Sequence, residues 1–165
     1  MRKLVYFAGP DLFFGCYQGK KDAIRRMCEA RDIYPLFPGD DEISDSKVIF
    51  RENVAKIREA HLLIANLNPF RSSVEPDSGT AFECGLAWSS GIPVIGVCQD
   101  RRPMMLRIDP ATHLCNEDGL LTCSDGAVIE NFGFPVNLML ATCTTAIVAT
   151  VEDAINLAAR LELPS

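Results

Sequence analysis

The sequence predicts a doubly wound α/β fold, in which helices cover both faces of a five-stranded parallel sheet. Short, nearly continuous apolar runs are typical of parallel strands buried on both sides, and they span residues 4–8, 33–37, 62–67, 93–98 and 145–149. Segments with helical spacing lie between these runs, so strands and helices alternate along the chain. Because right-handed crossovers leave few topologies, we expect a flavodoxin-like three-layer sandwich, as one domain over residues 1–165.

The intervening helices are indicated by apolar or small residues that recur every three or four positions. Three such sets follow the first three strands: Ala23, Ile24, Met27 and Cys28; Phe50, Val54, Ile57 and His61; Ala81, Gly85 and Trp88. A further helix is expected to start at Pro135, because proline is favoured at the first helical position. Thr150 with Asp153 resembles an N-terminal cap and opens a last helix.

One long stretch, residues 100–134, departs from this alternation. It shows no regular spacing and is punctuated by Pro103, Pro110, Gly119, Gly126 and Gly133. Loops of this length inside compact domains are usually lids, binding loops or subunit contacts. We therefore expect the stretch to serve one of these purposes.

Composition excludes several classes of protein. A net charge of −6 without a basic block argues against a nucleic-acid polymer as partner, and no apolar run approaches the length of a membrane span. Seven cysteines without paired spacing suit a reducing cytosol, so we expect a cytoplasmic protein. The nearest approach to a metal cluster is His113, Cys115 and Cys123, which lacks a fourth ligand at normal spacing. We expect neither a metal nor a cofactor.

Glu83 is the most informative residue in the chain. From Gly79 to Trp88 it is the only charged residue among small, apolar and aromatic ones, and such a helix is expected to be largely buried. Burial of an unpaired carboxylate is costly, so a sequence that places one there has a chemical use or a buried partner for it. The helix dipole near the amino end favours the charged form. Glu83 is therefore either a nucleophile or a structural residue bonded to a neighbouring backbone group or tyrosine.

Two further residues are candidates for the same site. Asp77 can cap the helix of Glu83, or it can act as a second carboxylate that handles a proton, as in glycosidic chemistry. Tyr6 lies near the end of the first strand, where its hydroxyl can bond Glu83 or simply be packed in the core. The sequence leaves both choices open.

The remaining candidates are predicted to bind substrate at the carboxyl ends of the strands, where ligands of such sheets bind. Phe13 can stack on a planar base or belong to the core, and Asn53 and Asn137 can be plain surface amides. His61 is more typical of a satisfied core histidine than of a catalyst. The binding candidates are Gly9, Pro10, Asp11, Phe13, Asp40, Asn53, Ser78, Gly79 and Asn137.

Taken together, these segments resemble the nucleoside 2-deoxyribosyltransferase family. The resemblance lies in residues 5–10, 53–57, 77–85 and 135–139. It implies a five-stranded α/β fold and a ping-pong exchange of nucleobases on 2-deoxyribose, in nucleoside salvage. Deoxynucleosides and free bases would be the small-molecule partners, and a homo-oligomer with composite sites would be expected, either a hexamer or a smaller dimer-based assembly.

The resemblance also implies roles for single residues. Glu83 matches the nucleophile, Tyr6 the tyrosine that orients it, and Asp77 the carboxylate near the departing base. Asn137 matches an asparagine that enters a neighbouring subunit's pocket and binds the 5-hydroxyl end of the sugar. Asn53 stands where family members often carry aspartate, and so does His61. Because an amide has no titrating proton, the proton for the leaving base falls to Asp77 or water.

Two rival functions remain open. A 2′-deoxynucleoside 5′-monophosphate N-glycosidase would use water in the second step and would need a phosphate site at the first turn, where Asp11 would repel phosphate. A non-catalytic flavodoxin-like nucleotide-binding module would explain the fold but not the lone carboxylate at position 83. The sequence favours the transferase.

Overall fold

Five parallel strands form the centre of the molecule in a computed structural model that describes residues 2–39, 45–109 and 113–162. They are β1 (Lys3–Ala8), β2 (Ile33–Leu36), β3 (Leu62–Asn66), β4 (Val94–Val97) and β7 (Ala146–Val148), and each lies within one residue of its predicted bounds. Their order is β2-β1-β3-β4-β7 and every neighbouring pair is parallel. The predicted fold class and strand order are confirmed.

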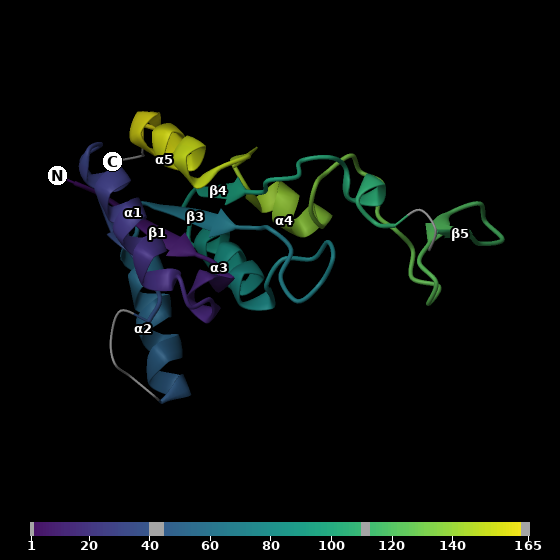
Figure 1. Cartoon of the computed structure of the whole chain (residues 1–165), viewed down its shortest axis with the longest axis horizontal. Coiled ribbons are helices and arrows are strands. Elements are labelled where there is room, and N and C mark those ends of the chain that lie inside the picture. The colour runs from purple at the N-terminus through teal and green to yellow at the C-terminus, as the bar shows by residue number, and fades with distance from the viewer. Residues whose placement is uncertain (1, 40–44, 110–112, 163–165) are drawn as a thin grey trace.

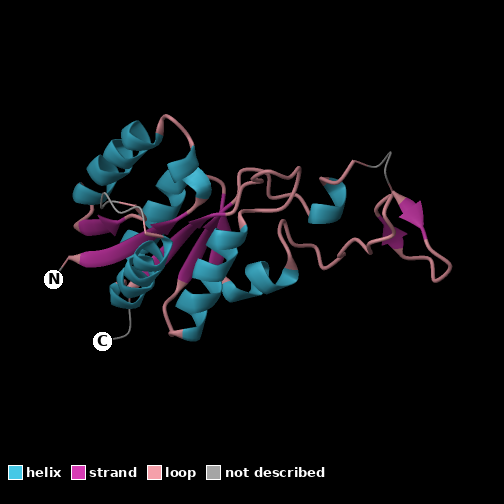
Figure 2. Cartoon of the chain, turned by 90° about the horizontal axis from the view of Figure 1, so that it is seen from below, coloured by secondary structure: helices cyan, strands magenta, loops and turns pink. Residues whose placement is uncertain are grey.

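Helices cover both faces of this sheet (Figures 1 and 2). One layer contains α1 (Tyr17–Glu29) and α5 (Val151–Arg160), and the other contains α2 (Ser46–Glu59), α3 (Ser78–Ser89) and α4 (Leu138–Cys143). Because side chains alternate along a strand, Val5 and Phe7 pack against the α1–α5 layer, whereas Tyr6 packs against the α2–α4 layer. The sheet therefore separates two apolar cores, and Tyr6 belongs to the one that also contains α3.

The expected caps on two helices are present. Asp77 precedes α3 and accepts a hydrogen bond from the backbone N–H of Thr80, while Thr150 precedes α5 and accepts from that of Asp153. In α5, Ile155 is fully buried against the sheet.

Two sequence predictions about helix ends are wrong. The helix expected to start at Pro135 begins at Leu138, because Asn137 caps it by accepting from the backbone N–H of Met139. His61 does not lie on a helix face, since α2 ends at Glu59. Its Nδ1 instead accepts a 3.0 Å hydrogen bond from the backbone N–H of Leu4, so it is a satisfied histidine beside the sheet.

The prediction that α3 is largely buried is also wrong for half of the helix. Cys84 and Ala87 are fully buried against the sheet, but Phe82 is 52% exposed and Trp88 is 64% exposed. The helix is apolar on every side, so composition alone cannot tell which side meets the sheet. Its outer side leaves large apolar side chains open to contact with another molecule.

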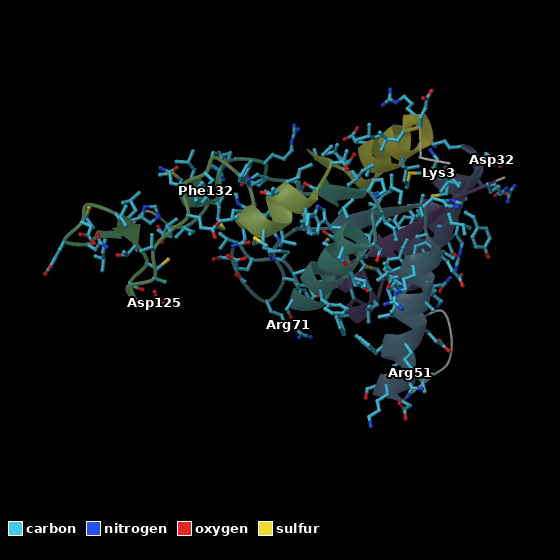
Figure 3. All side chains as sticks on the ribbon, turned by 180° about the vertical axis from the view of Figure 1, so that it is seen from behind. Lys3, Asp32, Arg51, Arg71, Asp125 and Phe132 are labelled. Atoms are coloured by element: carbon cyan, nitrogen blue, oxygen red, sulfur yellow. The ribbon has the colours of Figure 1, made fainter. Side chains whose placement is uncertain are left out.

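The irregular stretch of residues 100–134 contains an arm that extends away from the sheet. Figure 1 shows its hairpin at the far end, formed by the two-residue strands β5 (Leu114–Cys115) and β6 (Leu121–Thr122). Figure 3 shows Asp125 and Phe132 on this arm, far from Lys3 at the other end of the molecule. Short 3-10 turns lie at Pro10–Phe13 (η1) and Met104–Leu106 (η2). Among the described residues, no helix has both the length and the apolar character needed to cross a membrane.

Candidate active site

Tyr6 and Glu83 form the centre of the candidate site. Tyr6 is fully buried on β1, an inner strand of the sheet, and its hydroxyl donates a 2.7 Å hydrogen bond to Glu83 Oε1. Glu83 lies in the second turn of α3 and is half-buried. The strand fixes the ring and the helix fixes the carboxylate, so Tyr6 holds one Glu83 oxygen, while within the described residues the other oxygen makes no hydrogen bond.

The surroundings of Glu83 raise the pKa of its carboxyl group to near neutrality. Burial is the largest influence and raises the pKa of Glu83 to about 7, the Tyr6 hydrogen bond lowers it, and the nearby charge of Asp77 raises it. Burial, together with the Glu83 charge, also raises the pKa of Tyr6 above its usual range, so Tyr6 remains a hydrogen-bond donor. The sequence predicts a carboxylate kept charged by the helix dipole. In the structure, desolvation offsets that effect and Glu83 titrates near pH 7.

Asp77 sits at the amino end of the same helix. Its Oδ2 accepts hydrogen bonds from Thr80 at both the backbone N–H, at 2.9 Å, and the hydroxyl, at 3.1 Å. Thr80 is almost fully buried, which holds this carboxylate in place. A Cβ added to Gly79 would lie 2.9 Å from Asp77 Oδ2, so a larger residue there would displace the carboxylate from this position. Asp77 is thus a helix cap, and within the described residues its Oδ1 makes no hydrogen bond.

The turn after β1 is rigid. A Cβ on Gly9 would lie 2.9 Å from the Cβ of Asn66, so only glycine fits, and Pro10 begins η1. Both oxygens of Asp11 are engaged, Oδ1 by Lys20 Nζ and Oδ2 by Asn66 Nδ2, each at 2.9 Å. Asn66 was not among the individual binding candidates, although it lies at the carboxyl end of a buried strand, where ligands of such sheets bind.

A cavity of about 360 Å³ lies beside this turn. Gly9, Asp11 and Asn66 line it, together with Phe7 and residues of α1 and α5. Because Phe7 points to the opposite face of the sheet from Tyr6, this cavity and the Tyr6–Glu83 pair lie on different faces. Of the predicted binding residues, the structure places Gly9 and Asp11 at this cavity.

Phe13 forms an exposed aromatic surface and does not belong to the core. It is 57% exposed and stacks on Phe70, with ring centroids 5.6 Å apart and planes 17° apart. The guanidinium of Arg71, labelled in Figure 3, lies 5.1 Å from the Phe13 centroid and 4.6 Å from that of Phe70. An exposed Phe13 ring that is supported by the half-buried Phe70 and by a cation offers a platform for a planar base. The sequence indicated Phe13 but not its partners.

Asn137 lies on the far side of α3 from Glu83. It borders a groove of about 840 Å³ between α3 and α4, lined on the α3 side by Ser78, Ala81, Gly85 and Trp88. At about 100° per residue, these positions are roughly 140° to 160° around the helix from Glu83. The structure therefore does not bring Asn137 or Ser78 to the Glu83 of their own chain.

Comparison with known proteins decides the family. A family model described as nucleoside 2-deoxyribosyltransferase matches residues 5–139. The chain belongs to the nucleoside 2-deoxyribosyltransferase family. A 2-deoxyribosyltransferase structure from Leishmania mexicana is 33% identical, with a TM-score of 0.82 and coverage of 98% of this chain and 99% of that one. The family and this neighbour indicate an enzyme of the deoxyribosyltransferase type.

More distant structures share the fold. A conserved protein from Enterococcus faecalis is 23% identical with a TM-score of 0.61, and covers 98% of this chain and 100% of that one. A 2-deoxyribosyltransferase from Bacillus psychrosaccharolyticus is 17% identical with a TM-score of 0.57, and covers 98% and 99% of the two chains. The comparison with curated protein sequences found no match.

The structure shows few contacts for the other predicted residues of this deoxyribosyltransferase-family chain. Asn53 is half-buried on α2, and within the described residues its side chain makes no hydrogen bond. Asp40 lies outside the described residues. His113, Cys115 and Cys123 form no metal cluster, and the part of the chain that the structure describes holds no other group of three or more His, Cys, Asp or Glu residues suited to a metal.

Proposed function

We propose that this protein exchanges the nucleobase of 2′-deoxynucleosides by a retaining double displacement, with Glu83 as the nucleophile. The observation that supports it is the 2.7 Å hydrogen bond from Tyr6 to the Glu83 carboxylate. This bond orients a carboxyl group whose pKa burial raises to about 7. A nucleophile must be ionised, and a pKa of about 7 leaves about half of Glu83 ionised at pH 7. A non-catalytic module would give no reason for a desolvated carboxylate with a tyrosine donor.

In the first step a Glu83 oxygen attacks C1′ of the deoxynucleoside and the bond from C1′ to the base nitrogen breaks. The bonding electrons leave with the base, which takes a proton from Asp77 or from water. The product is a deoxyribosyl ester of Glu83. The transition state resembles an oxocarbenium ion, which the absence of a 2′-hydroxyl makes easier to form.

In the second step the nitrogen of an incoming base attacks C1′ and releases Glu83 as a carboxylate. The incoming base loses its proton to Asp77 or water, which restores the starting state of the enzyme. Two inversions retain the β configuration. Asp77 suits the proton role because its Oδ2 is fixed by Thr80 while Oδ1 is left for the base. We place no metal or cofactor in either step.

Asn137 is proposed to serve the site of a second copy of this chain. It lies across α3 from its own Glu83, beside a groove whose rim is apolar and open. Trp88 and Met139 at this groove are 64% and 72% exposed, which favours coverage by another subunit. Asn137 would then bind the 5′-hydroxyl end of a sugar held by the partner's Glu83.

The free cysteines suit a reducing compartment such as the cytoplasm.

Incubation with deoxyinosine and adenine tests the proposal, with chromatography for deoxyadenosine and mass spectrometry for a sugar adduct on Glu83. Glu83→Ala should abolish exchange and the adduct, whereas Glu59→Ala, which removes an exposed glutamate at the end of α2, should leave both unchanged. Wild-type exchange by Glu83→Ala would refute the nucleophile. The 5′-monophosphate N-glycosidase alternative is tested with deoxyinosine 5′-monophosphate in the absence of adenine, because such a hydrolase would release hypoxanthine from it as fast without an acceptor base as with one.

A further inference from the structure

Glu130, in the irregular stretch before α4, accepts two hydrogen bonds at the start of that helix. Its Oε1 accepts from Asn137 Nδ2 at 2.6 Å, and its Oε2 accepts from the backbone N–H of Leu138 at 2.9 Å. Asn137 Oδ1 in turn accepts from the backbone N–H of Met139 at 2.9 Å. Glu130 is half-buried, and no ion pair of the described residues includes it. The two oxygens of the Glu130 carboxylate are therefore hydrogen-bonded to the Asn137 amide and to the backbone N–H of Leu138.

These contacts fix which way the Asn137 amide faces. A flipped amide would set its NH₂ against the N–H of Met139 and its oxygen against the Glu130 carboxylate, and both contacts would be repulsive. In the observed orientation, one N–H hydrogen of Nδ2 and one lone pair of Oδ1 have no partner among the described residues. One donor beside one acceptor matches a hydroxyl group, which both donates and accepts.

We propose that Glu130 is the positioning residue that holds Asn137 for the 5′-hydroxyl of a deoxynucleoside, and that its negative charge excludes a 5′-phosphate. This assignment rests on the proposed function, in which Asn137 serves the active site of a second copy. It narrows the substrate class to deoxynucleosides with a free 5′-hydroxyl. Glu130 itself touches no substrate and acts through Asn137.

The charges beside Asn137 support the exclusion of phosphate. Among the described residues that line the α3–α4 groove, Glu75 is the only charged one, so no lysine or arginine there can neutralise an anion. A phosphate carries about −1.5 to −2 charges at pH 7. Held by the Asn137 amide, it would lie about 5 Å from the Glu130 carboxylate, and like charges at that separation weaken binding by about 100-fold. A neutral hydroxyl avoids this repulsion.

The test compares three donors with adenine as acceptor: deoxyinosine, 2′,5′-dideoxyinosine and deoxyinosine 5′-monophosphate. Wild type should prefer deoxyinosine over the monophosphate by about 100-fold in kcat/KM. Glu130→Gln keeps the shape but sets an NH₂ against one of the two donors, so kcat/KM for deoxyinosine should fall by about 10-fold. The value for 2′,5′-dideoxyinosine should not change, because that donor has no 5′-hydroxyl for Asn137 to bind.

Comparison of Glu130→Asp with Glu130→Gln separates the effect of position from the effect of charge. Glu130→Asp keeps the charge but shortens the reach, so it should lose rate on deoxyinosine and still reject the monophosphate. Glu130→Gln should reduce the preference against the monophosphate by about 10-fold or more. Glu117→Gln removes an exposed charge from the same stretch and should behave as wild type. Circular dichroism checks that α4 and the rest of the fold persist.

Distinct outcomes overturn distinct claims. An equal loss by Glu130→Gln on deoxyinosine and 2′,5′-dideoxyinosine would show a merely structural residue and refute the positioning role. An unchanged preference against the monophosphate in Glu130→Gln would refute the charge filter. Absence of exchange by the wild-type chain on every donor would refute the proposed function itself, and this assignment with it.

Discussion

A Tyr6→Phe variant removes the hydroxyl that donates to Glu83 and keeps the ring that fills the core. A hydrogen bond to a charged group contributes about 1.5–3 kcal/mol, and one pKa unit corresponds to about 1.4 kcal/mol. Loss of this donor should therefore raise the pKa of Glu83 by about one to two units from its value of about 7. The ionised fraction at pH 7 would fall from about a half to roughly a tenth or a hundredth.

The sign of the effect on activity follows from the role of the charged form. Because only ionised Glu83 attacks C1′, activity is lost as the pH falls through its pKa, and a raised pKa moves this loss to higher pH. At pH 7 the variant should have roughly 5- to 50-fold lower kcat/KM than wild type, and part of that loss should be recovered near pH 9.

The measurement is the pH profile of kcat/KM for base exchange from about pH 5 to about pH 9. Tyr34→Phe serves as a matched control, since Tyr34 is an exposed tyrosine on β2 and its profile should overlay that of wild type. If Tyr6→Phe lowered activity equally at every pH, with the acidic limb unmoved, the hydroxyl would not set the pKa of Glu83. That result would refute the electrostatic reasoning and leave Tyr6 as a steric support.

Variants of Asp77 separate its capping role from its proton role, and a variant of Glu83 tests the cost of its buried charge. Asp77→Asn keeps an oxygen for the Thr80 N–H and should leave the free energy of unfolding within about 0.5 kcal/mol of wild type, whereas Asp77→Ala should lose about 1 kcal/mol in urea denaturation. Both should lower the exchange rate by about 10²-fold or more if Asp77 handles the proton, and wild-type rates in Asp77→Asn would assign it to capping alone. Glu83→Gln should stabilise the fold, because a carboxyl whose pKa rises from 4.5 to about 7 on folding is penalised once it ionises. The gain should be absent below about pH 4.5, grow with pH and reach about 3 kcal/mol above pH 7; equal gains at about pH 5 and pH 8 in urea denaturation would contradict it.

The sheet and the central contact of the site were accessible from sequence for physical reasons. Strands buried on both faces need continuous apolar runs, and the runs at residues 4–8 and 62–67 can be read directly. The Tyr6–Glu83 hydrogen bond was one of the alternatives that the sequence offered, because a lone charge in an apolar helix needs a buried partner or a chemical use. The cap by Asp77 followed from the preference of aspartate for that position.

What the sequence did not reveal depends on contacts without periodicity. Glu130 holds Asn137 because of the path taken by an irregular segment, and no spacing rule predicts that path. The start of α4 was misplaced because the rule for proline competed with the cap of Asn137. Phe82 and Trp88 were expected inside because hydrophobicity alone does not distinguish a side chain in the core from one at the surface.

The arm that carries β5 and β6 divides the molecule into parts that open independently. Among the described residues, the backbone hydrogen bonds of residues 114–129 all join two residues of that same stretch. A two-stranded hairpin of this size is marginal on its own, so its amides can exchange with solvent while the sheet stays closed. Hydrogen exchange at Asn116 and Ile129, whose backbone N–H groups donate within this stretch, therefore reports the opening of the arm separately from the unfolding of the sheet.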